Sequence, residues 1–228
     1  MKLTSQQLDY IKGFISKRGF TALDLQMEII DHVACRVEDL RSENPALPFE
    51  DAVAQTHREF GIFGFATLEE AMMKSLTQKY RNQFALEFKR WFSFPTIILV
   101  AGFAFLLFQL FFMVATNWLI GIFGFTYLVL AVGVTAYQFK LKRRYRKMMI
   151  IQVTNSFAFL PTILLQFGGG LSEIPQSDAP LWLQASLFTA IILLFSFLFA
   201  SFFRVSRFAI RQCQEFEQRY PTVMGGET

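Results

Sequence analysis

The sequence predicts an all-α membrane protein, in which an N-terminal helical head precedes a bundle of four transmembrane helices. The first observation behind this is the run from Trp91 to Phe139, which contains no Asp, Glu, Lys or Arg in 49 residues. About 20 helical residues cross a hydrocarbon core about 30 Å thick, so this run is long enough for two crossings with a tight turn. The second observation is the cluster of six basic side chains that follows it, Lys140, Lys142, Arg143, Arg144, Arg146 and Lys147.

Composition supports a mixed soluble and membrane-embedded chain. Hydrophobic residues make up 53% of the chain and charged residues 18%, which is too apolar for an ordinary soluble domain and too charged for a chain that lies wholly in the membrane. The basic surplus lies after residue 93 and flanks the apolar runs, which favours a membrane-flanking role over nucleic-acid binding. We therefore expect a head over residues 1–90, a membrane region over 91–206 and a tail over 207–228.

Four apolar segments are expected to cross the membrane, at residues 94–116, 118–139, 148–167 and 181–203. The loops between them alternate in charge: the loops after the first and third segments contain no Lys or Arg, whereas the loop after the second carries the six-residue basic cluster. Basic residues also precede the first segment and follow the fourth. Because basic loops stay in the cytoplasm, we expect a multi-pass protein of the bacterial inner membrane with both termini cytoplasmic.

The third segment is the most polar of the four, and its polarity has two interpretations. Gln152, Asn155 and Gln166 are its amide side chains. Polar side chains in a membrane helix commonly form interhelical hydrogen bonds, which is the interpretation that we favour. The alternative is that they line a small polar cavity, as in a transporter subunit for a small solute or lipid.

The head is expected to be a run of short amphipathic helices. Thr4 and Gln7 fit a capping box at the start of the first helix, and Gly19 follows its end. A second helix from Thr21 is expected to carry one apolar stripe, formed by Leu23, Met27, Ile30, Ala34 and Val37. A third is expected over residues 49–60, with Ala52, Val53, Thr56 and Phe60 facing inward. A longer helix from Thr67 to about Phe92 would lead into the membrane with only a kink near Pro95.

The head resembles the HAAS domain, a small alpha-helical signalling domain associated with PadR-type transcriptional regulators. The resemblance covers roughly residues 5–65 and rests on four segments, which read Glu28-Ile29-Ile30-Asp31-His32, Val37-Glu38, Phe49-Glu50-Asp51-Ala52 and Glu59-Phe60-Gly61. The aromatic segment that follows, Ile62-Phe63-Gly64-Phe65, departs from the family pattern. The resemblance implies a membrane-anchored regulatory protein whose cytoplasmic protein partner is a PadR-type regulator, and it implies no catalytic residue.

The candidates for metal ligands in the head are Glu28, His32 and His57. Glu28 and His32 are four residues apart on one helix, and His57 lies on the next, so antiparallel helices could bring the three together. The pattern is not H-E-x-x-H and no third ligand is obvious, so we favour a simpler interpretation, a helix-stabilising Glu28–His32 pair with His57 on the surface. No motif predicts an enzyme or a cofactor, and Cys35 and Cys213 are expected to be free thiols.

The basic cluster has two compatible roles, because a cluster that sets topology also lies beside membrane lipids and can bind anionic headgroups. It shares the cytoplasmic side with the head, so we also expect it to contribute to a surface on which the head docks. The leading hypothesis is a regulatory or signalling membrane protein that binds a protein partner. The alternatives are the transporter subunit and a structural scaffold, a homo-oligomer assembled through small residues such as Gly121, Gly124, Ser196 and Ala200.

Overall fold

The computed structural model describes residues 3–156 and 178–220, and within these ranges the chain is helical and contains no strand. The residues fall into two compact units. One contains the described residues up to 78 together with 145–153 and those from 212 onward, and the other contains 79–144 with the described residues of 154–211. Three helices, α4, α7 and α9, run from one unit into the other.

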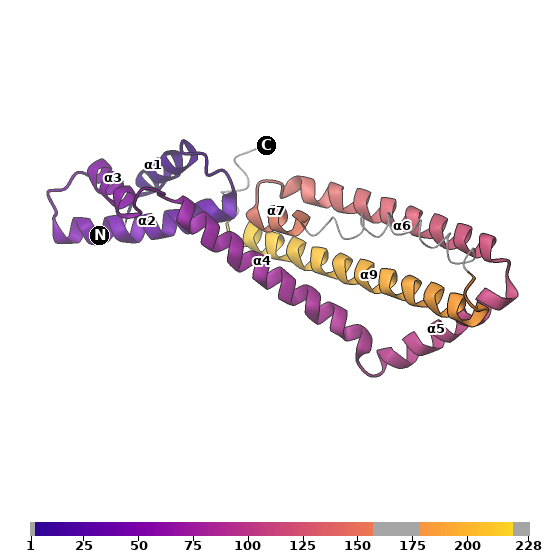
Figure 1. Ribbon diagram of the computed structural model, residues 1–228. Coiled ribbons are helices and arrows are strands. Elements are labelled where there is room, and N and C mark those ends of the chain that lie inside the picture. Colours follow the sequence, from indigo (N-terminus) through magenta and orange to yellow (C-terminus); the bar gives the residue numbers. More distant parts are fainter. Residues whose placement is uncertain (1–2, 157–177, 221–228) are drawn as a thin grey trace. The chain divides into compact units, whose positions relative to one another are not determined.

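The first unit is built around helix α2 (Leu23–Glu43), against which α1 (Ser5–Ser16) and α3 (Phe49–Glu59) both pack (Figure 1). The predicted capping box is confirmed: the Gln7 amide N–H donates to Thr4 Oγ1 over 3.3 Å, and the Thr4 amide N–H donates to Gln7 Oε1 over 2.9 Å. Ala52, Val53 and Thr56 of α3 are buried as predicted.

The buried side of α2 is broader than the predicted single stripe. Ile29, Val33 and Val37 are fully buried. Met27 and Ile30, which the sequence places on the inner face, are only partly buried. The difference arises because α2 packs against a helix on each of two sides, so its buried surface spreads over more than one row of side chains.

A tight turn joins α3 to α4 (Ala66–Lys89) and exposes two apolar side chains. Gly61 and Gly64 have φ values of 75° and 52°, which favour glycine. Phe65 is buried in edge-to-face contacts with Phe20, His57 and Phe60, at centroid distances of 5.9, 5.0 and 5.0 Å. Ile62 and Phe63, by contrast, are 97% and 71% exposed. We name these two residues the apolar tip.

Among the residues that the structure describes, three helices are long and apolar enough to cross a membrane: α5 (Thr96–Met113), α6 (Thr116–Arg144) and α9 (Leu181–Arg219). They contain most of the predicted segments 94–116, 118–139 and 181–203. For the remaining segment, 148–167, the structure describes helix α7 (Met149–Ser156), and residues 157–167 lie outside the described part of the chain.

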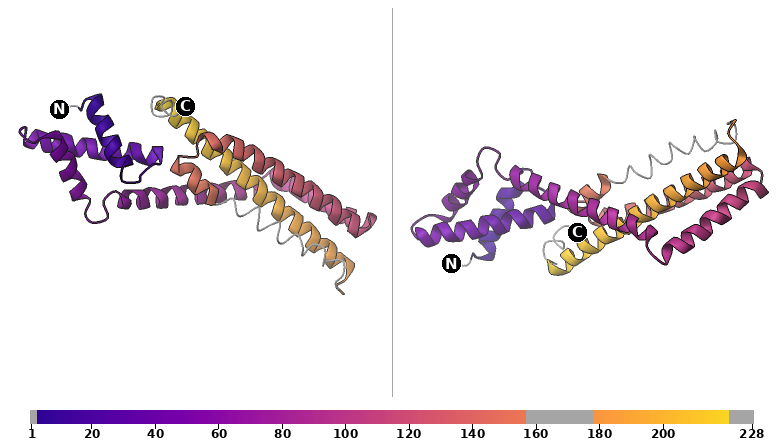
Figure 2. Two further views of the ribbon diagram at one scale, coloured as in Figure 1. Left: turned by 90° about the horizontal axis from the view of Figure 1, so that it is seen from above. Right: turned by 60° about the horizontal axis from the view of Figure 1, so that its bottom comes forward.

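Helices α6 and α9 lie side by side in all views (Figures 1 and 2). Leu119 packs in one cluster with Ala185 and Phe188, and further along, the Tyr127 ring lies 5.9 Å from Phe195. Residue numbers rise together along both helices, so α6 and α9 run parallel. Phe111 of α5 joins the cluster at their N-terminal ends, with its ring 5.5 Å from Phe188.

The chain does not continue from α4 into α5 as one kinked helix, which corrects the prediction. Helix α4 ends at Lys89, a 3₁₀ turn covers Arg90–Phe92, and Ser93 is extended at ψ 149°. The proline at position 95 disfavours helical geometry at the residue before it, and Ser93 Oγ donates to the Arg90 carbonyl over 2.7 Å. The result is a sharp bend between α4 and α5 (Figure 1).

Helix α9 continues without a break for 39 residues, about 58 Å at 1.5 Å per residue. The described residues of the predicted tail, from residue 207, belong to this helix as far as Arg219, and Cys213 is fully buried. Cys35 and Cys213 are both free thiols, as predicted.

Candidate functional site

The Asp24 carboxylate caps the start of helix α7, 125 residues further along the chain. Its Oδ1 accepts from the Met149 amide over 2.8 Å, and its Oδ2 accepts from the Ile150 amide over 3.0 Å. Oδ1 also accepts from the amide of Leu25 over 3.1 Å. The first amides of a helix have no partner within it, and a negative charge there is favourable, so Asp24 satisfies α7 in both respects.

Further contacts hold the loop after α6 against α2. The Leu23 amide donates to the Lys147 carbonyl over 3.0 Å. Met148 and Met149 are buried to 1% exposure or less. From the end of α9, Glu217 accepts a hydrogen bond of 2.7 Å from the Tyr145 hydroxyl. We call this assembly the head–loop junction, formed by residues 21–26, 145–150 and 213–217.

Asp24 is 6% exposed, so the junction depends on a buried polar group. A buried carboxylate is costly unless hydrogen bonds replace its water shell. Three backbone amides supply those bonds here. Removing either side of this arrangement would leave buried polar groups without partners, which makes the docked position of the loop specific.

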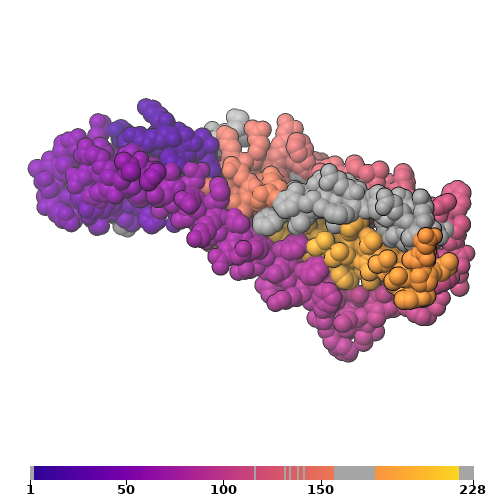
Figure 3. Space-filling model, viewed as in Figure 1, coloured from indigo at the N-terminus to yellow at the C-terminus, as the bar shows by residue number. Residues whose placement is uncertain are grey.

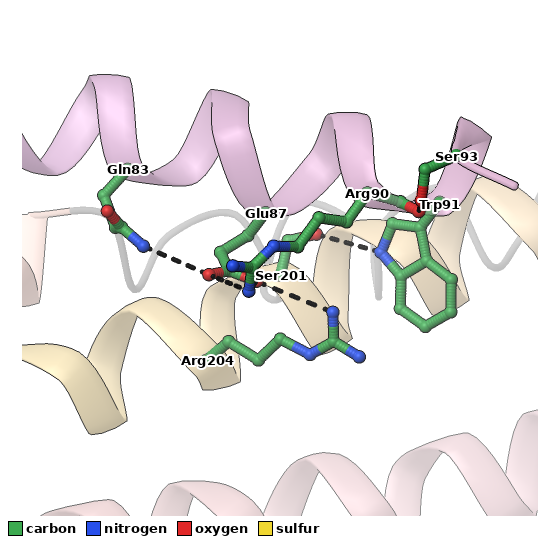
Figure 4. Close-up of polar contacts among 7 residues, drawn as sticks. All are labelled: Gln83, Glu87, Arg90, Trp91, Ser93, Ser201 and Arg204. Carbon is green, nitrogen blue, oxygen red and sulfur yellow. Dashed lines mark hydrogen bonds and ion pairs between the residues drawn. The ribbon is translucent and has the colours of Figure 1, made fainter. Parts of the chain in front are cut away.

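A second polar cluster joins α4 to α9 around Glu87, which is 5% exposed (Figure 4). Glu87 accepts from Arg90 over 2.9 and 3.0 Å and from the Gln83 amide group over 3.1 Å. Arg204 of α9 approaches its second oxygen at 3.5 Å. We call this the Glu87 cluster. The Glu87 carboxylate contacts Arg90 just after α4 and Arg204 of α9, and so links the end of α4 to α9.

Trp91 extends the Glu87 cluster into the apolar part of α9. Its indole N–H donates to Ser201 Oγ over 3.2 Å, and its ring stacks on Phe197 at 4.9 Å with planes 11° apart. The Arg204 guanidinium lies 4.9 Å from the centre of the Trp91 ring. Residue numbers that rise along α4 fall along α9, so these two helices are antiparallel.

The outward side of α4 is largely uncovered (Figure 3). Within α4 only Leu76, Tyr80 and Glu87 are buried. Leu76 and Tyr80 are four positions apart and Glu87 is seven further on, so all three share one narrow face. The Tyr80 ring lies 6.2 Å from Phe208 of α9. Because so few α4 side chains are buried, apolar packing alone gives the α4–α9 pairing little specificity. The polar contacts of the Glu87 cluster therefore supply much of it.

The structure brings together one residue of the basic cluster and one of the polar third segment. Lys142 is 8% exposed, and its Nζ donates to Asn155 Oδ1 over 2.9 Å. This contact agrees with the interhelical hydrogen bond expected for Asn155. Gln152 is exposed, and Gln166 lies outside the described residues. The other five basic residues of the cluster are exposed, namely Lys140, Arg143, Arg144, Arg146 and Lys147.

The predicted metal candidates do not converge. Glu28 and His32 approach at 3.4 Å on the exposed face of α2, as the pairing interpretation predicted. Among the described residues, no group of three or more His, Cys, Asp or Glu side chains is placed to hold a metal ion. His57 is not on the open surface, which corrects that expectation: its ring packs between Phe14 and Phe65, at 5.6 and 5.0 Å.

The small residues proposed for helix packing can each be examined for contacts with another described helix. A Cβ atom added at Gly121 or Gly124 would meet nothing within 4 Å, so neither glycine is used for a close approach between described helices. Ser196 Oγ donates to the Ile192 carbonyl of its own helix over 2.8 Å.

Comparison of the chain with protein-family models, with curated proteins and with solved structures gave no match. The functional argument therefore rests on the head–loop junction and the Glu87 cluster. Neither was identified from the sequence, because Asp24 and Glu87 look like ordinary helix-surface acids and their partners on other segments lie 117 to 126 positions away.

Replacing Asp24 by Ala should release the start of α7. An N-cap side chain is worth about 0.5–2 kcal/mol, so amide hydrogen exchange in residues 149–156 should quicken by up to about 30-fold. Exchange measured by mass spectrometry on the full chain in detergent tests this. Asp31→Ala, an exposed site on the same helix, is the control; equal exchange in both variants would contradict the capping role.

Replacing Glu87 by Gln should loosen α4 from α9, because the amide cannot neutralise the two arginines. Since Arg90 and Arg204 are partly exposed, we expect a loss of about 1–3 kcal/mol in this pairing. Exchange in residues 84–92 should rise accordingly, while the exposed Glu70→Gln leaves it unchanged. An unchanged rate in Glu87→Gln would show that apolar contacts alone hold the helices.

The pKa of His57 should lie below 6.5, the ordinary value for histidine, because burial and the nearby Arg18 both lower it. The folded head then favours neutral His57, so its stability falls as the pH drops from about 7 through 6.5 toward that lowered pKa. The chain has only two histidines, so ¹³C-histidine NMR gives two resonances, assigned with His57→Gln. Arg18→Ala should raise the His57 midpoint; titration of His57 above 6.5 would refute the assignment.

Proposed function

We propose that this chain is a membrane-anchored regulatory protein whose cytoplasmic head binds a protein partner and responds to its membrane helices. The Asp24 cap is the observation that carries this proposal. It attaches the head helix α2 to α7, which begins directly after the loop that follows the apolar helix α6. A change in α6 or α7 would therefore act on the head through specific hydrogen bonds, which a flexible tether could not do.

The proposal includes four membrane crossings with both termini in the cytoplasm. The parallel course of α6 and α9 supports it, since the chain between Arg144 and Leu181 has to return to the end at which α6 began. The basic ends of α6 and α9 then lie on one side, as the distribution of positive charge favours. Trp91, Arg90 and Arg204 fit a position at the cytoplasmic interface, where aromatic and basic side chains are preferred.

The apolar tip is the surface that we assign to the protein partner. Ile62 and Phe63 are highly exposed, while the glycines and Phe65 beside them are held in a defined turn. Exposed apolar side chains on a rigid turn lose little conformational entropy on binding, so they make effective contacts for a protein. The resemblance to HAAS domains makes a PadR-type transcriptional regulator the first partner to test.

The test uses the full chain in native membranes, with a photo-crosslinking amino acid at position 63. We expect a crosslink to one cytoplasmic protein that is lost in Ile62→Ser and changes in yield in Asp24→Ala. A crosslinker at the exposed Glu50 position is the matched control. If positions 50 and 63 label the same proteins equally, and Asp24→Ala changes nothing, the proposal fails.

A further inference from the structure

Two arginines that border the apolar segments of the chain meet at the Glu87 cluster (Figure 4). Arg90 is the last charged residue before the uncharged run that begins at Trp91, and Arg204 is the first charged residue after the apolar part of α9. Both contact one oxygen of Glu87, at 3.0 Å from Arg90 and 3.5 Å from Arg204. The two segments therefore change from polar to apolar at the same level, which is where the headgroup phosphates of a bilayer lie.

The guanidinium groups of these two arginines keep donors for a ligand. A guanidinium group carries five N–H donors, and Glu87 contacts each arginine through Nη1 alone. The side chains of Arg90 and Arg204 are 67% and 46% exposed, whereas that of Glu87 is 7% exposed. The buried carboxylate thus fixes one corner of each guanidinium group and leaves the rest accessible. Planar donors of this kind match the oxygens of a phosphate.

The charge of the Glu87 cluster favours an anion. Two guanidinium groups lie beside a single carboxylate, so the cluster has one positive charge in excess. Like charges this close repel each other, and an anion between them lowers that repulsion. Trp91 orients Arg204 for this role, because the Arg204 guanidinium lies over the indole ring and the indole N–H is bonded to Ser201.

Exposed aromatic side chains follow Arg90 directly in the chain. Phe92 and Phe94 are 58% and 80% exposed. The Phe92 ring lies 6.0 Å from the ring of Phe197, which belongs to the apolar part of α9. A ligand held by the arginines is therefore close to apolar surface as well as to positive charge. A phospholipid suits both, with its phosphate and its acyl chains, whereas a soluble phosphate suits only the positive charge.

We propose that Arg90 and Arg204 together bind the phosphate of an anionic phospholipid, such as phosphatidylglycerol, whose acyl chains lie against Phe92 and Phe94. The ammonium group of phosphatidylcholine or phosphatidylethanolamine would lie near the two guanidinium groups and be repelled, so the site selects a headgroup without a cation. The inference rests on the proposed function, since it needs α9 to cross the membrane. It deepens that function by naming a lipid that acts on the pairing of α4 with α9.

Lipid binding and the pairing of α4 with α9 are linked, because each side of the pair supplies one arginine. Arg90 directly follows α4, and Arg204 lies within α9. A phosphate held by both arginines stabilises the paired state, and by reciprocity a loosened pair lowers the lipid affinity by the same factor. An anionic membrane should therefore slow hydrogen exchange in residues 84–92 relative to a neutral one.

Binding is tested by quenching of Trp91 fluorescence, with the full chain in lipid vesicles. The other two tryptophans, Trp118 and Trp182, are 70% and 60% exposed and are first replaced by Phe, so that Trp91 alone is observed. Vesicles of phosphatidylcholine then receive increasing fractions of phosphatidylglycerol or phosphatidylcholine with brominated acyl chains, which quench tryptophan on contact. We expect half-maximal quenching at about a tenfold lower fraction of the brominated phosphatidylglycerol, the equivalent of one charge-assisted hydrogen bond.

Two variants distinguish this site from a general attraction of anionic lipid to basic side chains. The double variant Glu87→Gln with Arg204→Gln removes one charge of each sign, so it keeps the net charge of the cluster and leaves no buried carboxylate unpaired. It should lose the preference for phosphatidylglycerol, while quenching by brominated phosphatidylcholine stays the same and shows that the variant is still embedded. Arg81→Gln removes an exposed charge elsewhere on α4 and should keep the preference. A preference that survives in the double variant, or that Arg81→Gln lowers equally, overturns the proposal.

The outcomes separate this site from the proposed function. Equal quenching by the two brominated lipids in the chain with Trp91 alone removes the site but keeps α9 in the membrane. Absence of quenching by either lipid places Trp91 outside the membrane and contradicts both proposals. The crosslink at position 63 is a separate measurement, so its failure removes the protein partner and leaves the lipid preference interpretable.

Discussion

The buried carboxylate of Asp24 is the interaction on which the arrangement of the first unit depends. It lies at the start of one helix and satisfies the start of another, so two helix N-termini meet around one negative charge. Backbone amides at a helix start need a partner wherever water is excluded, and few side chains offer two acceptor oxygens in one plane. The loop after α6 consequently has one favoured position on the head.

The Glu87 cluster has a different role: it stabilises the pairing of α4, a largely polar helix, with α9, a largely apolar one. Lipid tails are as apolar as leucine, so helices near the membrane gain little from burying apolar surface and depend more on close packing and hydrogen bonds. Glu87, Arg204 and the Trp91–Ser201 bond provide such contacts at one level of α9. The stacked Trp91 and Phe197 rings then continue the pairing where polar groups are no longer favourable.

The parts of the fold that sequence patterns predicted are those set by local chemistry. The Thr4 capping box, the inward face of α3 and three long apolar helices depend on residues close together in the chain. The bend after α4 was underestimated, although the proline at position 95 marked its place. The candidate site could not be predicted, because Asp24 and Glu87 each acquire their role from a segment that is distant in sequence. Asn155 and Lys142 were each noticed for their polarity, yet only the folded chain pairs them.

The unbroken course of α9 makes one helix a member of both compact units. Phe188, near its start, packs into the cluster formed with α5 and α6, and Glu217, near its end, accepts the hydrogen bond of the Tyr145 hydroxyl. Successive turns of an α-helix are joined by backbone hydrogen bonds, so one continuous series of these bonds runs from the first set of contacts to the second.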